Sequence, residues 1–319
     1  MKVTILMAAF NGSRYIREQL DSICRQSYTD WELLVRDDRS QDNTLSILKE
    51  YELKDKRIRL ITSGELYGSS VSNFSQLFDC AANIKESYFM FSDQDDIWHE
   101  DKIKVSVNYI QQIEQRMQDK SPVLVYGGFN FVDEHGAPIA KQVQMPEKLA
   151  LTGLLTENHA YGCTMIFNRG LYEKVGHIPA TAENHDYWIA LVAAAFGTTA
   201  LNPQKLINYR QHGQNASGTV ERSSANSRIG RYIKNVNYLL PVLIRNFNMM
   251  KTFYVSYTGS FSSQQDQLIG GYIRTYQKNN FSLLAFLISN RIQKKGILQN
   301  LAHYYVLLHL RSKVVAAKA

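Results

Sequence analysis

An apolar run that ends in three carboxylates constrains the fold of this chain more than any other stretch. Residues 88–91 are Tyr-Phe-Met-Phe, and Asp93, Asp95 and Asp96 follow almost at once. The run lacks helical spacing, which favours an interior strand of a parallel sheet. Open α/β sheets bind ligands at the carboxyl ends of their strands. The stretch therefore predicts a buried strand that delivers acid to a ligand site.

The carboxylates after this run suit a metal ion. Asp93 and Asp95 lie two positions apart, so extended backbone would point them the same way, toward one hard cation. Three close carboxylates repel one another unless a positive charge lies among them. The alternative is a solvated loop in which Asp96 caps the next helix, and for an Asp-x-Asp pair taken alone this alternative is favoured. Other stretches of the chain are needed to choose between a metal site and a solvated loop.

The N-terminal part of the chain alternates between predicted strands and helices. Strands are predicted at residues 3–10, 31–35, 58–62, 88–91 and 123–126, and helices from Arg14 and at 45–51, 71–84, 102–117 and 149–155. This order predicts parallel strands with right-handed crossovers. The dinucleotide fingerprint and the P-loop motif are both missing from the sequence, so phosphates must be held in another way. A divalent cation on Asp93 and Asp95 is the available candidate.

Charge divides the chain near residue 219. Residues 1–219 contain 22 lysine and arginine residues against 27 aspartate and glutamate residues, whereas residues 220–319 contain 14 against 2. We therefore expect a catalytic domain over 1–219 and a basic helical extension over 220–319. Three widely spaced cysteines argue against a disulfide framework and suit a reducing compartment. No stretch reaches the ~18 to 20 apolar residues that a spanning helix needs.

Other polar positions stand at the ends of predicted elements. Asp38 follows the second strand, Asp186 opens an alanine-rich helix, and His212 follows a strand predicted at 206–210. Turn and cap chemistry is the alternative for Asp38, and an N-cap is the alternative for Asp186. A histidine at a strand end is more often structural than functional.

In chain order, three stretches resemble one known family. Residues 8–12 (Ala-Ala-Phe-Asn-Gly), 36–44 and 91–98 are similar to the inverting family 2 glycosyltransferases with the GT-A fold, particularly bacterial rhamnosyltransferases of surface polysaccharide assembly. The resemblance covers about residues 1–215. It implies an α/β nucleotide-binding fold with a mixed, mostly parallel central sheet. It also implies Mn²⁺ or Mg²⁺ and a nucleotide-sugar donor, with dTDP-rhamnose favoured.

The resemblance assigns the donor side of the site. Asp38 would bind the pyrimidine base of the donor, and an ionised carboxylate is a strong acceptor for an imide N–H. The nucleoside pocket would be lined by Ala9, Asn11 and Asn73. Asp93 would face the ribose, and Asp95 would bind the metal on the diphosphate. Asp96 would support them from outside the coordination sphere.

The resemblance also assigns the downstream residues. Asp186 would be the general base that takes a proton from the acceptor hydroxyl, with His185 beside it in support. His212 would be a further metal ligand or a phosphate contact, and Arg210 would support it.

Two residues are expected on the acceptor side. Gly162 lies in a strand predicted over 161–168, where a glycine lets a substrate approach the backbone closely. Trp188 follows the predicted base in the same His-Asp-Tyr-Trp stretch.

The basic extension is helical in pattern. Helices are expected at 223–240, where Pro241 would end the first of them, and at 242–257, 281–288 and 298–310. Basic faces with aromatic residues can lie on an anionic membrane, where a lipid-linked acceptor would be found. The alternative is a helical appendage that packs on the catalytic domain or on a second subunit. We therefore expect a cytoplasmic protein, peripheral on the inner face of the membrane if the first interpretation holds.

The resemblance, together with these patterns, implies a metal-dependent inverting glycosyltransferase that adds L-rhamnose to a growing, lipid-linked surface glycan. The same fold using a UDP-hexose or UDP-N-acetylhexosamine is the alternative. A nucleotidyltransferase would need a basic loop after the first strand, and residues 8–12 contain no lysine or arginine. A nucleic-acid-binding protein acting through the basic tail is disfavoured by the acidic body and the lack of a reader motif, so no nucleic acid partner is expected.

Overall fold

The computed structural model describes residues 1–62, 68–85, 87–117, 121–213, 239–293 and 297–317. The chain groups into two compact units. The first comprises Met1–Leu149, His159–Ala180 and Asn184–Thr219, and the second comprises Ala150–Asn158, Thr181–Glu183 and Val220–Ala319. Two short segments of the middle of the chain thus group with the C-terminal helices.

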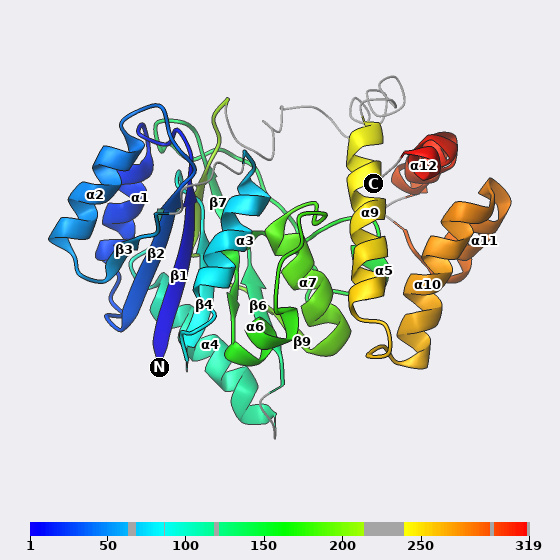
Figure 1. Cartoon of the computed structure of the whole chain (residues 1–319), viewed down its shortest axis with the longest axis horizontal. Coiled ribbons are helices and arrows are strands. Elements are labelled where there is room, and N and C mark those ends of the chain that lie inside the picture. The colour runs from blue at the N-terminus through cyan, green and yellow to red at the C-terminus, as the bar shows by residue number, and fades with distance from the viewer. Residues whose placement is uncertain (63–67, 86, 118–120, 214–238, 294–296, 318–319) are drawn as a thin grey trace. The chain divides into compact units, whose positions relative to one another are not determined.

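A seven-stranded sheet forms the centre of the first unit (Figure 1). Its strands are β1 (Lys2–Ala9), β2 (Trp31–Asp37), β3 (Ile58–Leu60), β4 (Ser87–Ser92), β6 (Val123–Gly127), β8 (Ile166–Phe167) and β9 (Thr198–Asn202). Their spatial order is β3-β2-β1-β4-β8-β6-β9. Only β8 runs antiparallel to its neighbours β4 and β6. The predicted mixed, mostly parallel sheet is confirmed.

Helices cover both faces of this sheet (Figure 1). One face packs against α1 (Ile16–Cys24), α2 (Thr44–Lys54) and α4 (Lys102–Arg116), and the other against α3 (Ser70–Cys80), α6 (Arg169–Val175) and α7 (His185–Phe196). The strand alternation explains this, because Ile5 and Met7 of β1 join Leu20 of α1 in one apolar cluster. On the opposite face, Phe91 of β4 packs on Phe167 of β8.

A second, three-stranded sheet positions the loop after β4. It contains β5 (Ile97–Trp98), β10 (Ile207–Arg210) and β7 (Asn130–Val132), in the order β5-β10-β7. β5 pairs antiparallel with β10, with Ile207 opposite Trp98. The strand predicted at 206–210 is therefore present, and it delivers the residues that follow it to the acidic loop.

The second unit is helical. Its helices are α5 (Leu151–Leu154), α9 (Leu240–Ser256), α10 (Ser263–Lys278), α11 (Asn280–Ser289) and α12 (Ile297–Ala316). The helices predicted at 242–257, 281–288 and 298–310 are confirmed, whereas most of the pattern at 223–240 lies outside the described residues. None of the helices within the described ranges combines the length and the hydropathy needed to cross a bilayer.

Two local predictions were wrong. Residues 161–168 do not form one strand, because Gly162–Thr164 makes a 3₁₀ turn (η1) and only Ile166–Phe167 pairs in the sheet. The Thr164 hydroxyl stabilises that turn by donating to the Tyr161 carbonyl at 2.7 Å. Pro241 does not end a helix but lies in the first turn of α9, where its missing N–H costs no hydrogen bond.

Candidate active site

A buried ion pair at the end of β2 organises the predicted nucleobase side of the site. The Arg36 guanidinium lies 3.0 Å from Asp38 Oδ1, and both side chains are almost fully buried. The same nitrogen donates to Asn73 Oδ1 at 2.9 Å, and Asn73 Nδ2 donates to the Ala9 carbonyl at 3.3 Å. The structure thus brings Ala9, Asp38 and Asn73 together through Arg36, for which no role was predicted. An arginine directly after the apolar residues 33–35 of the strand was the available signal.

Both oxygens of the Asp38 carboxylate accept hydrogen bonds. Its Oδ2 accepts from the Gly68 N–H at 2.9 Å, while Oδ1 accepts from the Arg36 guanidinium.

Side chains from two other loops hold the turn after β1. Gln94 donates to the Phe10 carbonyl at 2.9 Å and accepts from the Phe10 N–H at 2.8 Å. Gly12 makes room for it, because a Cβ there would lie 2.3 Å from Gln94 Oε1. Asn11 adopts a positive φ of 47° and accepts from the Gln41 N–H at 2.8 Å. The middle residue of the Asp-x-Asp stretch therefore joins this turn to the acidic loop.

The acidic loop is crowded and buried. One ligand atom each of Asp93, Asp96 and Cys163 lies within 4.8 Å of the others. Asp96 Oδ2 accepts no hydrogen bond from an N–H or O–H of the described residues. Burial, together with the charges of Asp95 and Asp186, raises the pKa of Asp93 to about 7. Burial and the neighbouring carboxylates also raise the pKa of Asp96 well above its usual range.

Arg210 fastens this loop to the small sheet. Its N–H donates to Asp96 Oδ1 at 3.2 Å, and its Nε donates to the Asp95 carbonyl at 2.9 Å. The buried guanidinium also pairs with Glu18 of α1. The alternative in which Asp96 caps the next helix is wrong, because α4 begins after Asp101. Asp96 and Arg210 instead connect the acidic loop to the three-stranded sheet through hydrogen bonds.

The two predicted metal ligands are adjacent. His212 Nε2 lies 2.7 Å from Asp95 Oδ2, and both side chains are mostly buried. The imidazole packs on the ring of Tyr15, with centroids 4.8 Å apart. No role in the site was predicted for Tyr15, and its contact with His212 had no counterpart in the sequence pattern.

The predicted general base lies in the first turn of α7. Asn184 is the N-cap, so the alternative in which Asp186 caps the helix is wrong. Asp186 Oδ2 accepts from the Gly162 N–H at 2.9 Å. Next to it, the His185 ring stacks on Phe74 with centroids 3.7 Å apart, and burial lowers its pKa to about 3. His185 is therefore neutral and supports the site through packing.

Gly162 and Trp188, the two residues predicted on the acceptor side, both lie in packed parts of the structure. Trp188 is 2% exposed, because α7 is apolar on nearly every side and buries its indole. A Cβ on Gly162 would lie 2.6 Å from His185 Nε2 and 3.3 Å from Asp186 Cβ. The space beside this glycine is thus filled by the start of α7. Both residues support the helix that carries Asp186, and neither presents a surface to an acceptor.

Residues 4–176 match the family described as Glycosyl transferase family 2, which is more than half of the chain. This chain belongs to glycosyl transferase family 2. The resemblance inferred from the three motifs is therefore confirmed, and the chain is a glycosyltransferase. The match contains the whole donor side of the predicted site. Asp186, Arg210 and His212 lie beyond it.

This family 2 glycosyltransferase is similar to two named relatives over different lengths of the chain. The putative teichuronic acid biosynthesis glycosyltransferase TuaG of Bacillus subtilis (strain 168) is 28% identical over 213 residues, which cover 65% of this chain and 78% of TuaG. The dTDP-rhamnosyl transferase RfbG of Shigella flexneri is 40% identical over 103 residues, which cover 32% of this chain and 36% of RfbG.

Two solved structures confirm the GT-A fold. S. aureus TarS 1–349 in complex with UDP has a TM-score of 0.58 at 15% identity, covering 99% of this chain and 90% of that one. The mannosyltransferase PcManGT from Pyrobaculum calidifontis, in complex with GDP-Man and Mn²⁺, has a TM-score of 0.54 at 15% identity. It covers 98% of this chain and 85% of that one.

The residues of the acidic loop fit a divalent cation. Carboxylate oxygens and an imidazole are donors that Mn²⁺ accepts, and carboxylates alone suit Mg²⁺. Asp95 and His212 already lie within contact distance, and Asp96 Oδ2 is buried without an N–H or O–H donor. Burial and the charges of Asp95 and Asp186 raise the pKa of Asp93, and a cation among these carboxylates would offset their repulsion.

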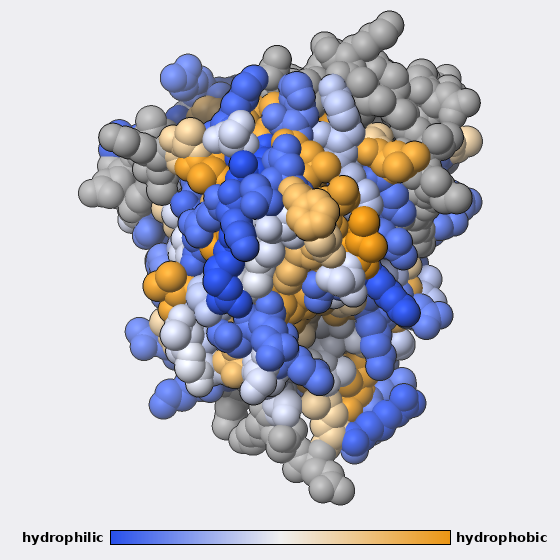
Figure 2. Space-filling model, turned by 90° about the vertical axis from the view of Figure 1, so that its right-hand side faces the viewer, coloured by the Kyte–Doolittle hydropathy of each residue, from blue (hydrophilic) through white to orange (hydrophobic). Residues whose placement is uncertain are grey.

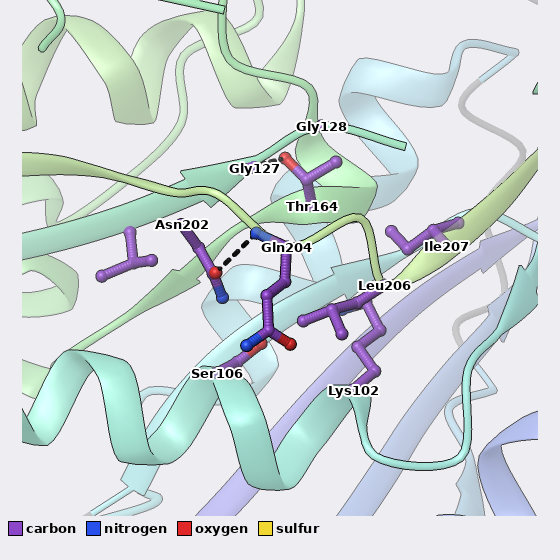
Figure 3. Close-up of a pocket in the computed structure, with 10 residues that line it drawn as sticks. Lys102, Ser106, Gly127, Gly128, Thr164, Asn202, Gln204, Leu206 and Ile207 are labelled. Carbon is purple, nitrogen blue, oxygen red and sulfur yellow. Dashed lines mark hydrogen bonds between the residues drawn. The ribbon is translucent and has the colours of Figure 1, made fainter. Parts of the chain in front are cut away.

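A cavity behind this loop is too small for a substrate. It lies between α4, β6 and the segment that joins β9 to β10, and Figure 3 shows Lys102, Thr164 and Gln204 along its wall. Its volume of about 10 Å³ is room for roughly one water molecule. Lys102 is buried, and its Nζ lies 3.7 Å from the centroid of the Trp98 ring. Burial lowers the pKa of Lys102 to about 7. This cavity is therefore not a donor site.

Proposed function

We propose that this enzyme transfers L-rhamnose from dTDP-rhamnose to a hydroxyl of a growing surface glycan, with inversion at the anomeric carbon. The observation that carries the proposal is the convergence of four carboxylates from three separate parts of the chain. Asp38 follows β2, Asp93 and Asp95 follow β4, and Asp186 lies in the first turn of α7. Asp186 is near enough to raise the pKa of Asp93. These carboxylates would contact, in turn, the base, the sugars and the diphosphate of a nucleotide sugar, and the acceptor hydroxyl.

Asp186 is the proposed general base. The acceptor oxygen would form a bond to the anomeric carbon while the bond from that carbon to the diphosphate oxygen breaks, and Asp186 would take the acceptor proton. The Gly162 N–H holds one carboxylate oxygen in place, which orients the base before the acceptor arrives. Such positioned bases contribute about 10²- to 10⁴-fold to a rate.

Donor recognition would divide between two ends of the site. At one end, Asp38 accepts the imide N–H of thymine, with Ala9, Asn11 and Asn73 around the nucleoside. At the other, Asp93 accepts hydroxyls of the sugar or the deoxyribose. Asp95 and His212 would hold Mn²⁺ or Mg²⁺, which when bound supplies positive charge to the departing diphosphate.

The preference for a deoxyhexose rests on sequence. The dTDP-rhamnosyl transferase RfbG is 40% identical to this chain over 103 residues, which supports this preference. A UDP-hexose or UDP-N-acetylhexosamine donor would use the same carboxylates.

We further propose that the acceptor is lipid-linked.

A donor screen tests the proposal directly. The melting temperature of the protein would be measured with Mn²⁺ and each of dTDP-rhamnose, UDP-glucose, UDP-N-acetylglucosamine and GDP-mannose. We expect the largest rise with dTDP-rhamnose, and a ligand at 100 times its Kd stabilises by about 2.7 kcal/mol. A larger rise with a UDP-sugar would assign the alternative donor. No rise with any donor would contradict the proposed site.

A further inference from the structure

Helix α11 is apolar on every side, yet much of it is exposed. Its sequence contains no charged residue, and only Leu283 and Leu287 are buried. Phe281 is 82% exposed and Ile288 is 59% exposed. A soluble helix normally turns a polar face outward, so an apolar outward face needs a covering partner.

Helix α12 packs against α11 and carries further exposed apolar side chains. Arg311 of α12 donates to Asn280 Oδ1 at 2.6 Å, and Tyr304 donates to the Ile292 carbonyl at 3.0 Å, so α11 and α12 pack antiparallel. On the outer side of α12, Leu301 is 60% exposed and Tyr305 is 46% exposed. Figure 2 shows apolar side chains gathered among hydrophilic ones on this side of the molecule.

The charged residues of the sequence that contains these two helices have one sign. Residues 267–319 contain eight lysine and arginine residues and no aspartate or glutamate. Lys278 lies two residues before α11 and Arg291 two residues after it, and both side chains are exposed. The last acidic residue before this stretch, Asp266, is engaged by the Tyr254 hydroxyl at 2.9 Å. An apolar face on a stretch whose charged residues are all cationic is complementary to an apolar surface that carries anions.

The length of α11 and the positive charge near it indicate which kind of partner covers the exposed apolar side chains. The ten residues of α11 span about 15 Å, half of the ~30 Å hydrocarbon core, so the helix cannot cross a bilayer. A second copy of the same face would bring two sets of like charges together, which opposes a symmetric contact. An anionic lipid surface satisfies the apolar and the charged parts at once.

We propose that α11 and α12 form a docking face for an anionic phospholipid bilayer, defined by Phe281, Ile288, Leu301 and Tyr305. The apolar side chains enter the boundary between headgroups and acyl chains, and Lys278 and Arg291 contact lipid phosphates. The face holds the enzyme at the surface without a spanning segment. The inference does not depend on the proposed donor or acceptor, because binding is measured without either.

The test is co-sedimentation of the full chain with vesicles. We expect binding to phosphatidylcholine vesicles that contain phosphatidylglycerol, and weaker binding to phosphatidylcholine alone or at high salt. Phe281→Ser with Ile288→Ser should weaken partitioning about tenfold or more, since both apolar side chains lose their burial in lipid. Lys278→Gln should weaken it about fivefold on anionic vesicles only.

Matched controls use exposed residues of the other unit. Leu53, which is 88% exposed on α2, is the apolar control, and Lys104 of α4 is the charged control. Leu53→Ser and Lys104→Gln should leave vesicle binding unchanged. All these positions are exposed, so melting temperatures should stay near that of the parent and verify folding.

Two results would overturn the proposal. One is equal partitioning of the parent and the Phe281→Ser/Ile288→Ser variant. The other is a parent that ignores vesicles but forms an oligomer that the same variant converts to a monomer, which would assign the face to a second copy of the chain.

Discussion

The backbone N–H of Gly162 donates to Asp186 Oδ2 at 2.9 Å, across 24 residues of sequence. The 3₁₀ turn that contains Gly162 therefore sets the direction of the proposed base. Because His185 and Asp186 fill the space beside the glycine, this turn and the start of α7 fit together as one unit.

Gly162→Ala should impair transfer while leaving the donor bound. The new Cβ would meet His185 Nε2 at 2.6 Å, so the start of α7 must shift and Asp186 with it. A displacement of this kind can cost about 10²-fold in rate. Steady-state transfer and donor calorimetry measure the two effects. Gly153→Ala is the control, because its Cβ has open space, and a similar loss there would discredit the explanation.

Asp186→Asn should remove transfer almost completely. Asparagine keeps the shape and can still accept from the Gly162 N–H, but it cannot take a proton. We expect a loss of about 10²- to 10⁴-fold in kcat with unchanged donor affinity. Turnover within a few-fold of the parent would assign the base to another residue.

Asp95→Asn should reduce donor affinity in Mn²⁺ to the level measured without metal. His212→Gln should act in the same direction, because His212 Nε2 lies 2.7 Å from Asp95 Oδ2. Calorimetry with and without Mn²⁺ separates this effect from a general loss of binding. Asp79→Asn is a matched control, since Asp79 pairs with His177 at 3.1 Å in an exposed Asp–His contact. Metal-dependent binding that survives Asp95→Asn would remove that residue from the metal site.

Arg36→Met should lower both stability and donor affinity. Removing one partner of a buried ion pair costs about 3 to 5 kcal/mol, because the Asp38 charge stays buried without its cation. Adding Asp38→Asn removes that charge, so the double variant should regain much of the stability in urea unfolding. Its donor affinity should remain low. Recovery of both properties would separate Asp38 from the donor.

His185 should make the fold sensitive to acid. Its pKa of about 3 in the folded state lies below the usual 6.5, so between these values the unfolded chain binds a proton that the native chain does not. The contribution of His185 to stability therefore falls as pH drops through this window, by about 1.4 kcal/mol per pH unit. His185→Gln should lower stability at pH 7 but flatten the fall toward pH 5. Parallel stability curves for parent and variant would contradict the assignment.

Strand ends were the part of the site that the sequence predicted well. Buried strands are written as continuous apolar runs, so the positions of Asp38 and Asp93 at their ends could be located without coordinates. The His212 contact with Asp95 was also anticipated, although it depends on pairing between β5 and β10.

The misses have physical causes. A short apolar run such as residues 161–168 has no periodicity that separates a strand from a 3₁₀ turn. The placement of Trp188 depended on which side of an almost wholly apolar helix faces solvent, and such a helix carries no moment to decide it. The capping box of α10, Ser262 with Gln265, was a readable signal for a helix that was not predicted.

The contact between Gly12 and Gln94 has a practical consequence for protein engineering. Gln94 occupies the volume that any larger residue at position 12 would claim, and it closes both hydrogen bonds of Phe10. If only one of these two segments is replaced by that of a homologue, a larger residue at position 12 would collide with Gln94. A different residue at position 94 would leave the Phe10 backbone without its two hydrogen bonds. The turn after β1 and the acidic loop should therefore be transferred together when the donor specificity of one enzyme is engineered into another.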